Sequence, residues 1–192
     1  MEKLCIKPSA CFLAAAAILI LPIPWFFSAI AAATFHELCH WISLRLMGKK
    51  IRSLTISCRG AILETEPLTT NQELICALAG PLGSLSMLGL LQFFPGMVLC
   101  ATIHGMYNLL PLYPLDGGRA IHCACKRFLS PNAAKKFCNT VEILVGALIL
   151  LAGISTALVF RLGFFPVLFS LIIAGRCLLR KIPCKAAKLG VQ

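Results

Sequence analysis

The residues of this sequence best suited to chemistry are two histidines and a glutamate in the stretch His36-Glu37-Leu38-Cys39-His40. Residues four apart on a helix share one face, so His36 and His40 can direct two imidazoles at the same metal ion. This spacing, with a glutamate after the first histidine, is typical of a zinc-binding pair with its general base. The pattern predicts that His36 and His40 bind zinc and that Glu37 transfers protons.

The motif lies in an apolar part of the chain, because no charged residue occurs between Lys7 and Glu37. Of the 192 residues, 59% are hydrophobic and 13% are charged, and the mean hydropathy is +0.88. A soluble domain of this size could not bury so much apolar surface, which indicates a multi-pass membrane protein. Ionisable residues inside a membrane are costly, so the motif is expected to be functional.

A zinc site of this kind needs a third ligand, and Asp116 is the only aspartate in the chain. It follows an apolar segment, and its expected depth in the membrane is comparable to that of His40. Two imidazoles and one carboxylate leave a fourth position for water, which is the pattern of catalytic zinc sites. The alternative is that Asp116 caps the helix that begins near Gly117, and the two roles are compatible.

Three further residues are candidates for contact with a substrate. Gly80 and Pro81 predict a break inside a membrane helix, which requires protein or a water-filled cavity to satisfy the freed backbone groups. Asn108 could donate a hydrogen bond to a carbonyl group under attack, or equally satisfy backbone groups freed by the prolines that follow it. His104, one turn earlier, is expected to be a packing residue rather than a ligand.

The elements that must position these residues are about six transmembrane helices. The expected spans cover about 10–21, 25–46, 74–94, a short span from about 97 into the segment 108–119, 141–160 and 164–179. A basic helix through residues 119–136 separates the fourth span from the fifth. Residues 51–65 alternate in polarity around Arg59-Gly60, which predicts a membrane-associated β-hairpin, with a surface loop as the alternative. The expected fold class is therefore an all-α polytopic membrane protein with one small hairpin.

The formal net charge of +11 is explained by topology. Six spans place both termini on one side of the membrane, and the lysines and arginines gather on that side, with Arg161 alone on the other. This asymmetry places both termini in the cytoplasm and the His-Glu-His motif toward the cytoplasmic leaflet. A nucleic acid partner is not needed to account for the charge.

Three segments together resemble the site-2 protease family of intramembrane zinc metalloproteases, and within it the bacterial stage IV sporulation protein FB type. They are His36-Glu37-Leu38-Cys39-His40, Ala79-Gly80-Pro81 and the segment 108–119, NLLPLYPLDGGR. They occur in the order of the family and define a catalytic core of about residues 25–127. The resemblance implies one zinc ion held by His36, His40 and Asp116, with Glu37 as general acid and base. It also implies a small membrane-associated sheet after the first motif, in agreement with the hairpin.

Two positions depart from the family pattern. Cys39 stands where a glycine is usual, and Ser84 stands where many members have asparagine. The second difference leaves the positioning of the substrate open. We expect a single membrane-embedded domain over residues 1–192, with no PDZ or CBS domain.

The resemblance implies an endopeptidase of the bacterial cell membrane that cleaves a transmembrane or membrane-adjacent segment of a protein. A sigma or anti-sigma factor, as in sporulation or other regulated intramembrane proteolysis, is one such substrate. The expected partners are this substrate and the lipid bilayer, and the sequence does not identify an inhibitory membrane partner. Two alternatives stay open. A catalytically silent relative is disfavoured by the retained Glu37, and a metal transporter is disfavoured by ligands that gather at one depth.

Overall fold

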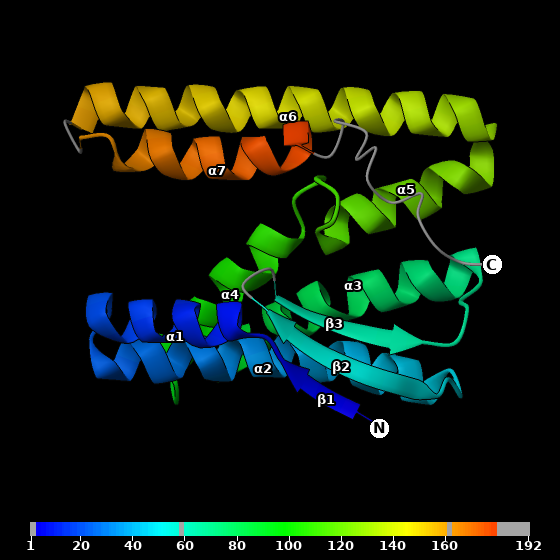
Figure 1. Cartoon of the computed structure of the whole chain (residues 1–192), viewed down its shortest axis with the longest axis horizontal. Coiled ribbons are helices and arrows are strands. Elements are labelled where there is room, and N and C mark those ends of the chain that lie inside the picture. The colour runs from blue at the N-terminus through cyan, green and yellow to red at the C-terminus, as the bar shows by residue number, and fades with distance from the viewer. Residues whose placement is uncertain (1–2, 58–59, 161–162, 180–192) are drawn as a thin grey trace.

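The computed structural model describes residues 3–57, 60–160 and 163–179, which form helices around a small sheet (Figure 1). In chain order, the elements are β1 (Lys3–Ile6), α1 (Pro8–Ile20), α2 (Ile23–Leu46), β2 (Ile51–Ser57), β3 (Gly60–Thr65), α3 (Thr70–Ser86), the 3-10 helix η1 (Met87–Leu90), α4 (Pro95–Asn108), α5 (Asp116–Phe128), α6 (Pro131–Phe160) and α7 (Phe165–Leu179). The chain is therefore mainly helical.

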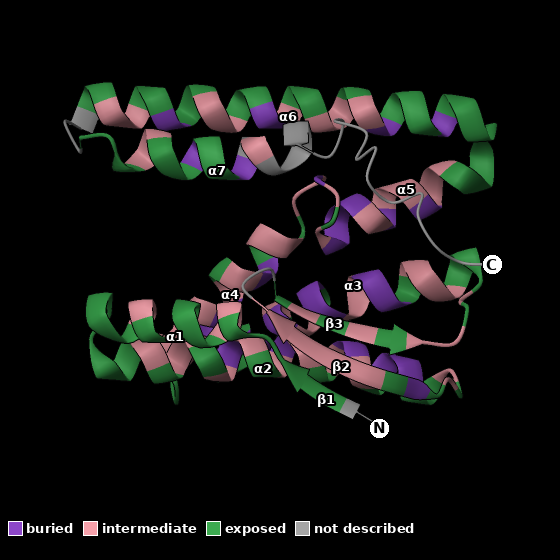
Figure 2. Cartoon of the chain, in the orientation of Figure 1, coloured by how far each residue is buried: buried purple, intermediate pink, exposed green. Residues whose placement is uncertain are grey.

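The helices form two bodies that α5 connects (Figure 1). In the first, α2 packs against α3 and α4, and the sheet lies beside α2. In the second, α6 and α7 form an antiparallel hairpin. Helix α5 contacts α3 in the first body and α6 in the second. Its first residue, Asp116, therefore lies at the first body. Buried residues gather on α2, α3 and α5, at the centre of the molecule (Figure 2).

Prolines and a capping box determine where several helices begin. Pro8 and Pro24 lie in the first turns of α1 and α2, where a missing N–H costs no intrahelical hydrogen bond. At α3, the Thr69 hydroxyl accepts a hydrogen bond from the Gln72 N–H, and the Gln72 side chain accepts one from the Thr69 N–H. This reciprocal pair satisfies two backbone donors that the helix leaves free.

The hairpin expected at 51–65 is present. Strands β2 and β3 are antiparallel, with Ile51 opposite Thr65 and Ser57 opposite Gly60; Arg59, expected in the turn, lies outside the described residues. Strand β1 was not expected, and it pairs parallel to β2 to complete a sheet of order β1-β2-β3. It has only four residues and runs directly into α1, so in sequence it is indistinguishable from the start of an apolar segment.

A helix lies in each of the six expected spans, but only two helical segments among the described residues are long and apolar enough to cross a membrane alone. These are Thr70–Leu90 and Pro131–Val159. Helix α4 has 14 residues and α7 has 15. At 1.5 Å per residue each reaches about 21–23 Å, less than the hydrocarbon thickness of about 30 Å. The expectation of six independent spans is thus supported for two.

Two local expectations were wrong. Helix α3 continues through Gly80 and Pro81 without a break, because a single proline removes one hydrogen bond and close packing of neighbouring helices compensates for it. The basic helix expected through 119–136 is instead divided: α5 ends at Phe128, and α6 starts at Pro131 and continues into the fifth expected span.

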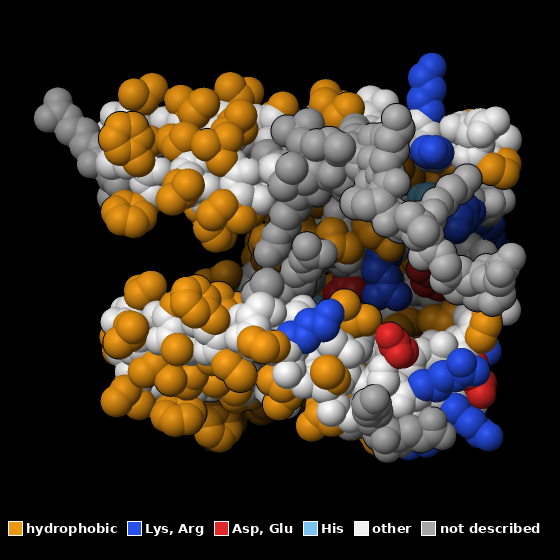
Figure 3. Space-filling view, in the orientation of Figure 1, with side chains coloured by type: hydrophobic (Ala, Val, Ile, Leu, Met, Phe, Trp, Pro, Cys, Tyr) orange, Lys and Arg blue, Asp and Glu red, His pale blue; other side chains and the backbone are white. Residues whose placement is uncertain are grey.

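The surface of the described residues is strongly apolar at one end. Hydrophobic side chains cover α1, α2, α6 and α7 there, and lysines and arginines collect toward the opposite end (Figure 3). Large side chains are widely exposed, including Phe12 at 79%, Leu19 at 87% and Phe164 at 87%. A contiguous surface of this kind is unfavourable in water and suits contact with lipid.

Candidate metal centre

Three side chains that are far apart in sequence meet between α2 and the start of α5. His36 Nε2 lies 3.2 Å from His40 Nε2, and each of the two nitrogens lies 3.1 Å from Asp116 Oδ2. All three residues are buried, with at most 7% of their surface exposed. Among the described residues, they form the one group of three or more ligand-type side chains that could hold a metal ion.

The outer nitrogen of each imidazole is held by α3. His40 Nδ1 lies 2.7 Å from the carbonyl oxygen of Cys76, which can only accept, so Nδ1 carries the proton and Nε2 keeps a lone pair. His36 Nδ1 lies 3.0 Å from the hydroxyl of Ser84, which accepts from Nδ1–H in the matching tautomer. Such contacts fix the tautomer and orientation of metal-binding histidines.

This arrangement leaves three electron-pair donors facing one another in a buried space. With both imidazoles neutral, two lone pairs and a carboxylate oxygen at 3.1–3.2 Å repel each other, and either a proton on one imidazole or a metal ion between the three atoms relieves this repulsion. Ligands at about 2.0–2.2 Å from a tetrahedral zinc ion are separated from one another by about 3.3 Å. The donor types and their spacing therefore fit zinc, with His36, His40 and Asp116 as the residues that would hold it.

Gly80 provides the room beside this group. A Cβ atom at position 80 would lie 2.2 Å from His40 Nε2 and 2.7 Å from His36 Nε2. Gly80 thus lies against the two donor nitrogens, and its role in the structure is to leave their shared space empty. Pro81 is buried on the same helix.

Asp116 is positioned by the loop 109–115, which folds against the first turn of α5. A Cβ atom at Gly117 would lie 2.0 Å from the Leu109 carbonyl oxygen, so only glycine permits this approach. Asp116 is the first residue of α5 and Leu115 is the N-cap, so the alternative role of Asp116 as a helix cap is not found. The Glu142 carboxylate of α6 accepts a hydrogen bond from the Tyr113 N–H at 3.3 Å, which ties this loop to the second body.

Arg119 holds the other oxygen of the aspartate. Its Nη1 donates to Asp116 Oδ1 at 3.4 Å, and its Nε lies 3.9 Å from Glu73 Oε1 on α3. Because Oδ1 is engaged by Arg119, Oδ2 is the oxygen directed at the two imidazoles. Both contacts are long, so Arg119 orients the carboxylate more than it binds it tightly.

The remaining expected site residues lie near this centre with different partners. Glu37 is half-buried on α2, next to His36. Asn108 Nδ2 donates to the His104 carbonyl oxygen of its own helix at 3.1 Å. The His104 ring lies edge-on to His36, with ring centres 4.7 Å apart, so this histidine packs directly against a candidate ligand.

Sequence reasoning named Gly80 only as a candidate substrate contact and assigned Cys76 and Ser84 no role at the metal centre, although a signal for these residues on α3 exists. Positions 76, 80 and 84 are spaced by four, so they occupy one face of α3 in the same way that 36 and 40 occupy one face of α2. The structure shows that these two faces meet. Cys76, Gly80 and Ser84 therefore form one wall of the candidate centre.

Comparison with known proteins supports the fold. No protein-family model matches the chain, and no curated protein matches its sequence. Among solved structures, the chain is similar to a site-2 protease from Methanocaldococcus jannaschii, with a TM-score of 0.63 and 20% sequence identity. The alignment covers 92% of this chain and 91% of that one. The chain thus has the fold of that protease over nearly its whole length.

Proposed function

We propose that this protein is a zinc-dependent intramembrane endopeptidase. The observation that carries the proposal is the convergence of His36 Nε2, His40 Nε2 and Asp116 Oδ2 within 3.2 Å of one another, beside a glutamate on the same helix. The fold shared with a site-2 protease and the apolar surface support the same activity.

In this proposal, the chain supplies ligands, a base and a fixed geometry. When bound, zinc acts as a Lewis acid that acidifies water and polarises the carbonyl group of a peptide bond. The Glu37 carboxylate accepts the proton of the attacking water and passes it to the amide nitrogen that leaves. The Cys76 carbonyl and the Ser84 hydroxyl hold both imidazoles in position, so the ligands need little rearrangement.

The substrate in this proposal is a protein segment within or next to the membrane. Helical peptide bonds are shielded, so the segment must be extended when it is cleaved. Strand β3 lies at one end of the sheet order, and an extended segment could pair with its outer edge. The proposal includes a sigma or anti-sigma factor as substrate and a role in sporulation, which rest on the resemblance of the motifs alone. It also includes cytoplasmic termini, which rest on the charge distribution.

The test separates metal binding from catalysis. The purified protein, reconstituted with zinc in liposomes, is assayed against single-span membrane peptides that carry a fluorophore. We expect Glu37→Gln to keep one zinc per chain and to lose cleavage by about 10²–10⁴-fold, which is the contribution of a general base. Asp116→Ala should lose the metal itself.

Glu66→Gln is the matched control, since Glu66 lies in the segment between β3 and α3 and is expected to leave both zinc content and cleavage unchanged. Undiminished cleavage by Glu37→Gln would refute the role of Glu37. Full zinc retention by Asp116→Ala would refute the ligand set.

A further inference from the structure

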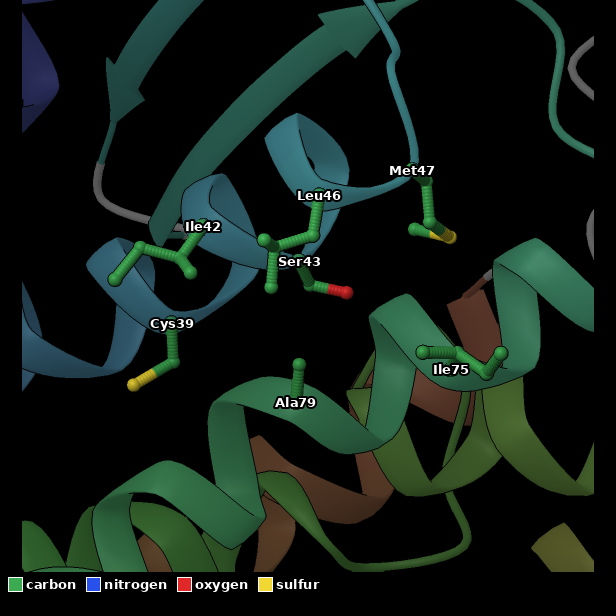
Figure 4. A pocket seen from close by; sticks show the side chains of 7 residues that line it. All are labelled: Cys39, Ile42, Ser43, Leu46, Met47, Ile75 and Ala79. Carbon is green, nitrogen blue, oxygen red and sulfur yellow. The ribbon is translucent and has the colours of Figure 1, made fainter.

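The three candidate ligands are held from two different sides. His36 and His40 lie on α2, and α3 fixes the outer nitrogen of each ring. A pocket of about 350 Å³ between these two helices is lined by residues 39–47 and 75–79, so the loop 109–115 and α5 do not reach that part of the contact (Figure 4). Asp116 comes from the loop and α5, and the contacts that direct its carboxylate must be sought there.

One peptide unit of this loop, the one that joins Leu112 to Tyr113, is held by three contacts. Its carbonyl oxygen accepts a hydrogen bond from the Leu115 N–H at 2.8 Å. Its N–H donates to Glu142 Oε1 of α6 at 3.3 Å. Gly118 lies against it, since a Cβ atom there would lie 2.5 Å from both the Leu112 carbonyl carbon and the Tyr113 nitrogen. Leu115 directly precedes the candidate ligand aspartate and Gly118 follows it by two residues, so this peptide unit supports the chain on both sides of the ligand.

Apolar packing places the loop without fixing the orientation of this peptide unit. Leu112 is 2% exposed and packs with Ile173 of α7, and Val145 of α6 borders the same cluster. Hydrophobic contacts are not directional, whereas a hydrogen bond requires a particular distance and angle. The bond from the Tyr113 N–H to Glu142 is therefore a directional contact between the loop and the α6–α7 hairpin.

Glu142 occupies an apolar helix. No other charged residue occurs between Lys136 and Arg161, and the described helix around it, Pro131–Val159, is long and apolar enough to cross a membrane. An ionisable residue in such a segment is costly and usually has a specific role. A carboxylate oxygen accepts a hydrogen bond more strongly than a neutral oxygen does, which suits it to hold a backbone N–H.

We propose that Glu142 is a positioning residue of the candidate metal centre. By holding the peptide unit between Leu112 and Tyr113, its carboxylate sets the first turn of α5, and that turn directs Asp116 Oδ2 at the two imidazoles. The route runs from α6 through one peptide unit to the ligand. This inference rests on the proposed zinc site and adds to it a residue that lies outside all three sequence motifs.

The first measurement needs no metal. Hydrogen exchange of the metal-free protein in detergent, read by mass spectrometry, reports on the Tyr113 amide. Glu142→Leu removes the acceptor and should speed this exchange by at least about tenfold, whereas Glu142→Gln keeps an oxygen acceptor and should stay within about threefold of the original chain. Thr140→Leu is the control, because it makes an apolar change at an exposed position of the same helix, where the hydroxyl donates to the Lys136 carbonyl.

The second measurement is zinc affinity by competition with a chelator, together with the visible absorption of Co²⁺ bound in place of zinc, which depends on ligand geometry. We expect Glu142→Leu to weaken zinc binding by about 10–100-fold and to change the Co²⁺ spectrum, and Glu142→Gln to preserve both. A merely structural role would lower the unfolding temperature and leave the Co²⁺ spectrum of the folded protein unchanged.

Gly118→Ala disturbs the same peptide unit from α5 and keeps Glu142, so it tests the route even if Glu142→Leu does not fold. It should weaken zinc binding, and the double variant should lose less than the product of the two single losses, because both act through one peptide unit. Independent losses would overturn the proposal, as would an unchanged zinc affinity in Glu142→Leu or an equal loss in Glu142→Gln. An original chain that binds no zinc would refute the proposed function as well, whereas these other outcomes refute the role of Glu142 alone.

Discussion

Replacing Gly80 by alanine adds one methyl group at the point where the candidate metal ligands converge. The new Cβ atom would lie 2.2 Å from His40 Nε2 and 2.7 Å from His36 Nε2. Because zinc bonds histidine nitrogens at about 2.0–2.1 Å, the methyl group would occupy much of the space that the ion requires. To restore ordinary van der Waals contact, α3 would have to move away by about 1 Å, together with the Cys76 carbonyl and the Ser84 hydroxyl that hold the two imidazoles. Loss of such support alone costs about 10–100-fold in metal affinity, and the methyl group in the space of the ion adds to this loss.

We therefore expect Gly80→Ala to weaken zinc binding by at least about 100-fold, which corresponds to about 2.8 kcal/mol. Zinc content after dialysis and competition with a chelator of known affinity measure this. Gly89→Ala is the matched control: it makes the same change in the neighbouring helical segment η1, where the added Cβ would meet nothing within 4 Å. If Gly80→Ala bound zinc as tightly as Gly89→Ala, the ion could not lie between the two Nε2 atoms, and the reasoning would fail.

Three further outcomes follow from other contacts of the structure and from the proposed function. Ser84→Ala removes the partner of His36 Nδ1 at 3.0 Å and should weaken zinc binding by about 10–100-fold. Ser86→Ala is the control and should leave zinc binding unchanged, because the Ser86 hydroxyl donates to a carbonyl of its own helix. Competition with a chelator measures both affinities. Gly153→Ala would place a Cβ atom 2.8 Å from a backbone oxygen of α7 and should destabilise the α6–α7 hairpin by about 1–3 kcal/mol. Thermal unfolding in detergent measures this, with Gly175→Ala as the control because its added Cβ would meet nothing within 4 Å. Removal of metal by a chelator should abolish cleavage and added zinc should restore it, and cleavage that persists without metal would contradict the proposed mechanism.

The candidate ligand set could be predicted from the sequence because each member carries a local signal. His36 and His40 are four residues apart, and Asp116 is the only aspartate. The roles of Gly80 and Ser84 were not accessible, because they depend on how α3 is rotated against α2. A Gly-Pro pair in an apolar helix predicts a break by its backbone chemistry alone. Whether the helix bends there or continues is decided by the neighbours, and here they pack closely enough for it to continue.

The fold shows a similar division between local and long-range information. Prolines and the Thr69 capping box act within one helical turn, so helix starts near them can be read from the sequence. Strand β1 forms only because β2, some fifty residues later, offers it an edge. Four residues bury too little surface to form a strand alone, so no pattern within them could indicate it.

The packing around position 84 explains why serine fits there, where many members of the family that the motifs resemble have asparagine. Helix α4 approaches α3 closely at this point, since a Cβ atom on Gly105 would lie 2.8 Å from the Ser84 Cβ and 3.2 Å from the Pro81 carbonyl oxygen. Ser84 itself is fully buried, and its short hydroxyl already reaches His36 Nδ1. A longer asparagine in the same place would have to displace either α4 or the imidazole. The serine and the facing glycine are therefore a matched pair: close packing of α3 on α4 fixes the hydroxyl, and the hydroxyl fixes the ligand. Position 84 in this chain is thus occupied by a side chain that holds His36 of the candidate metal centre.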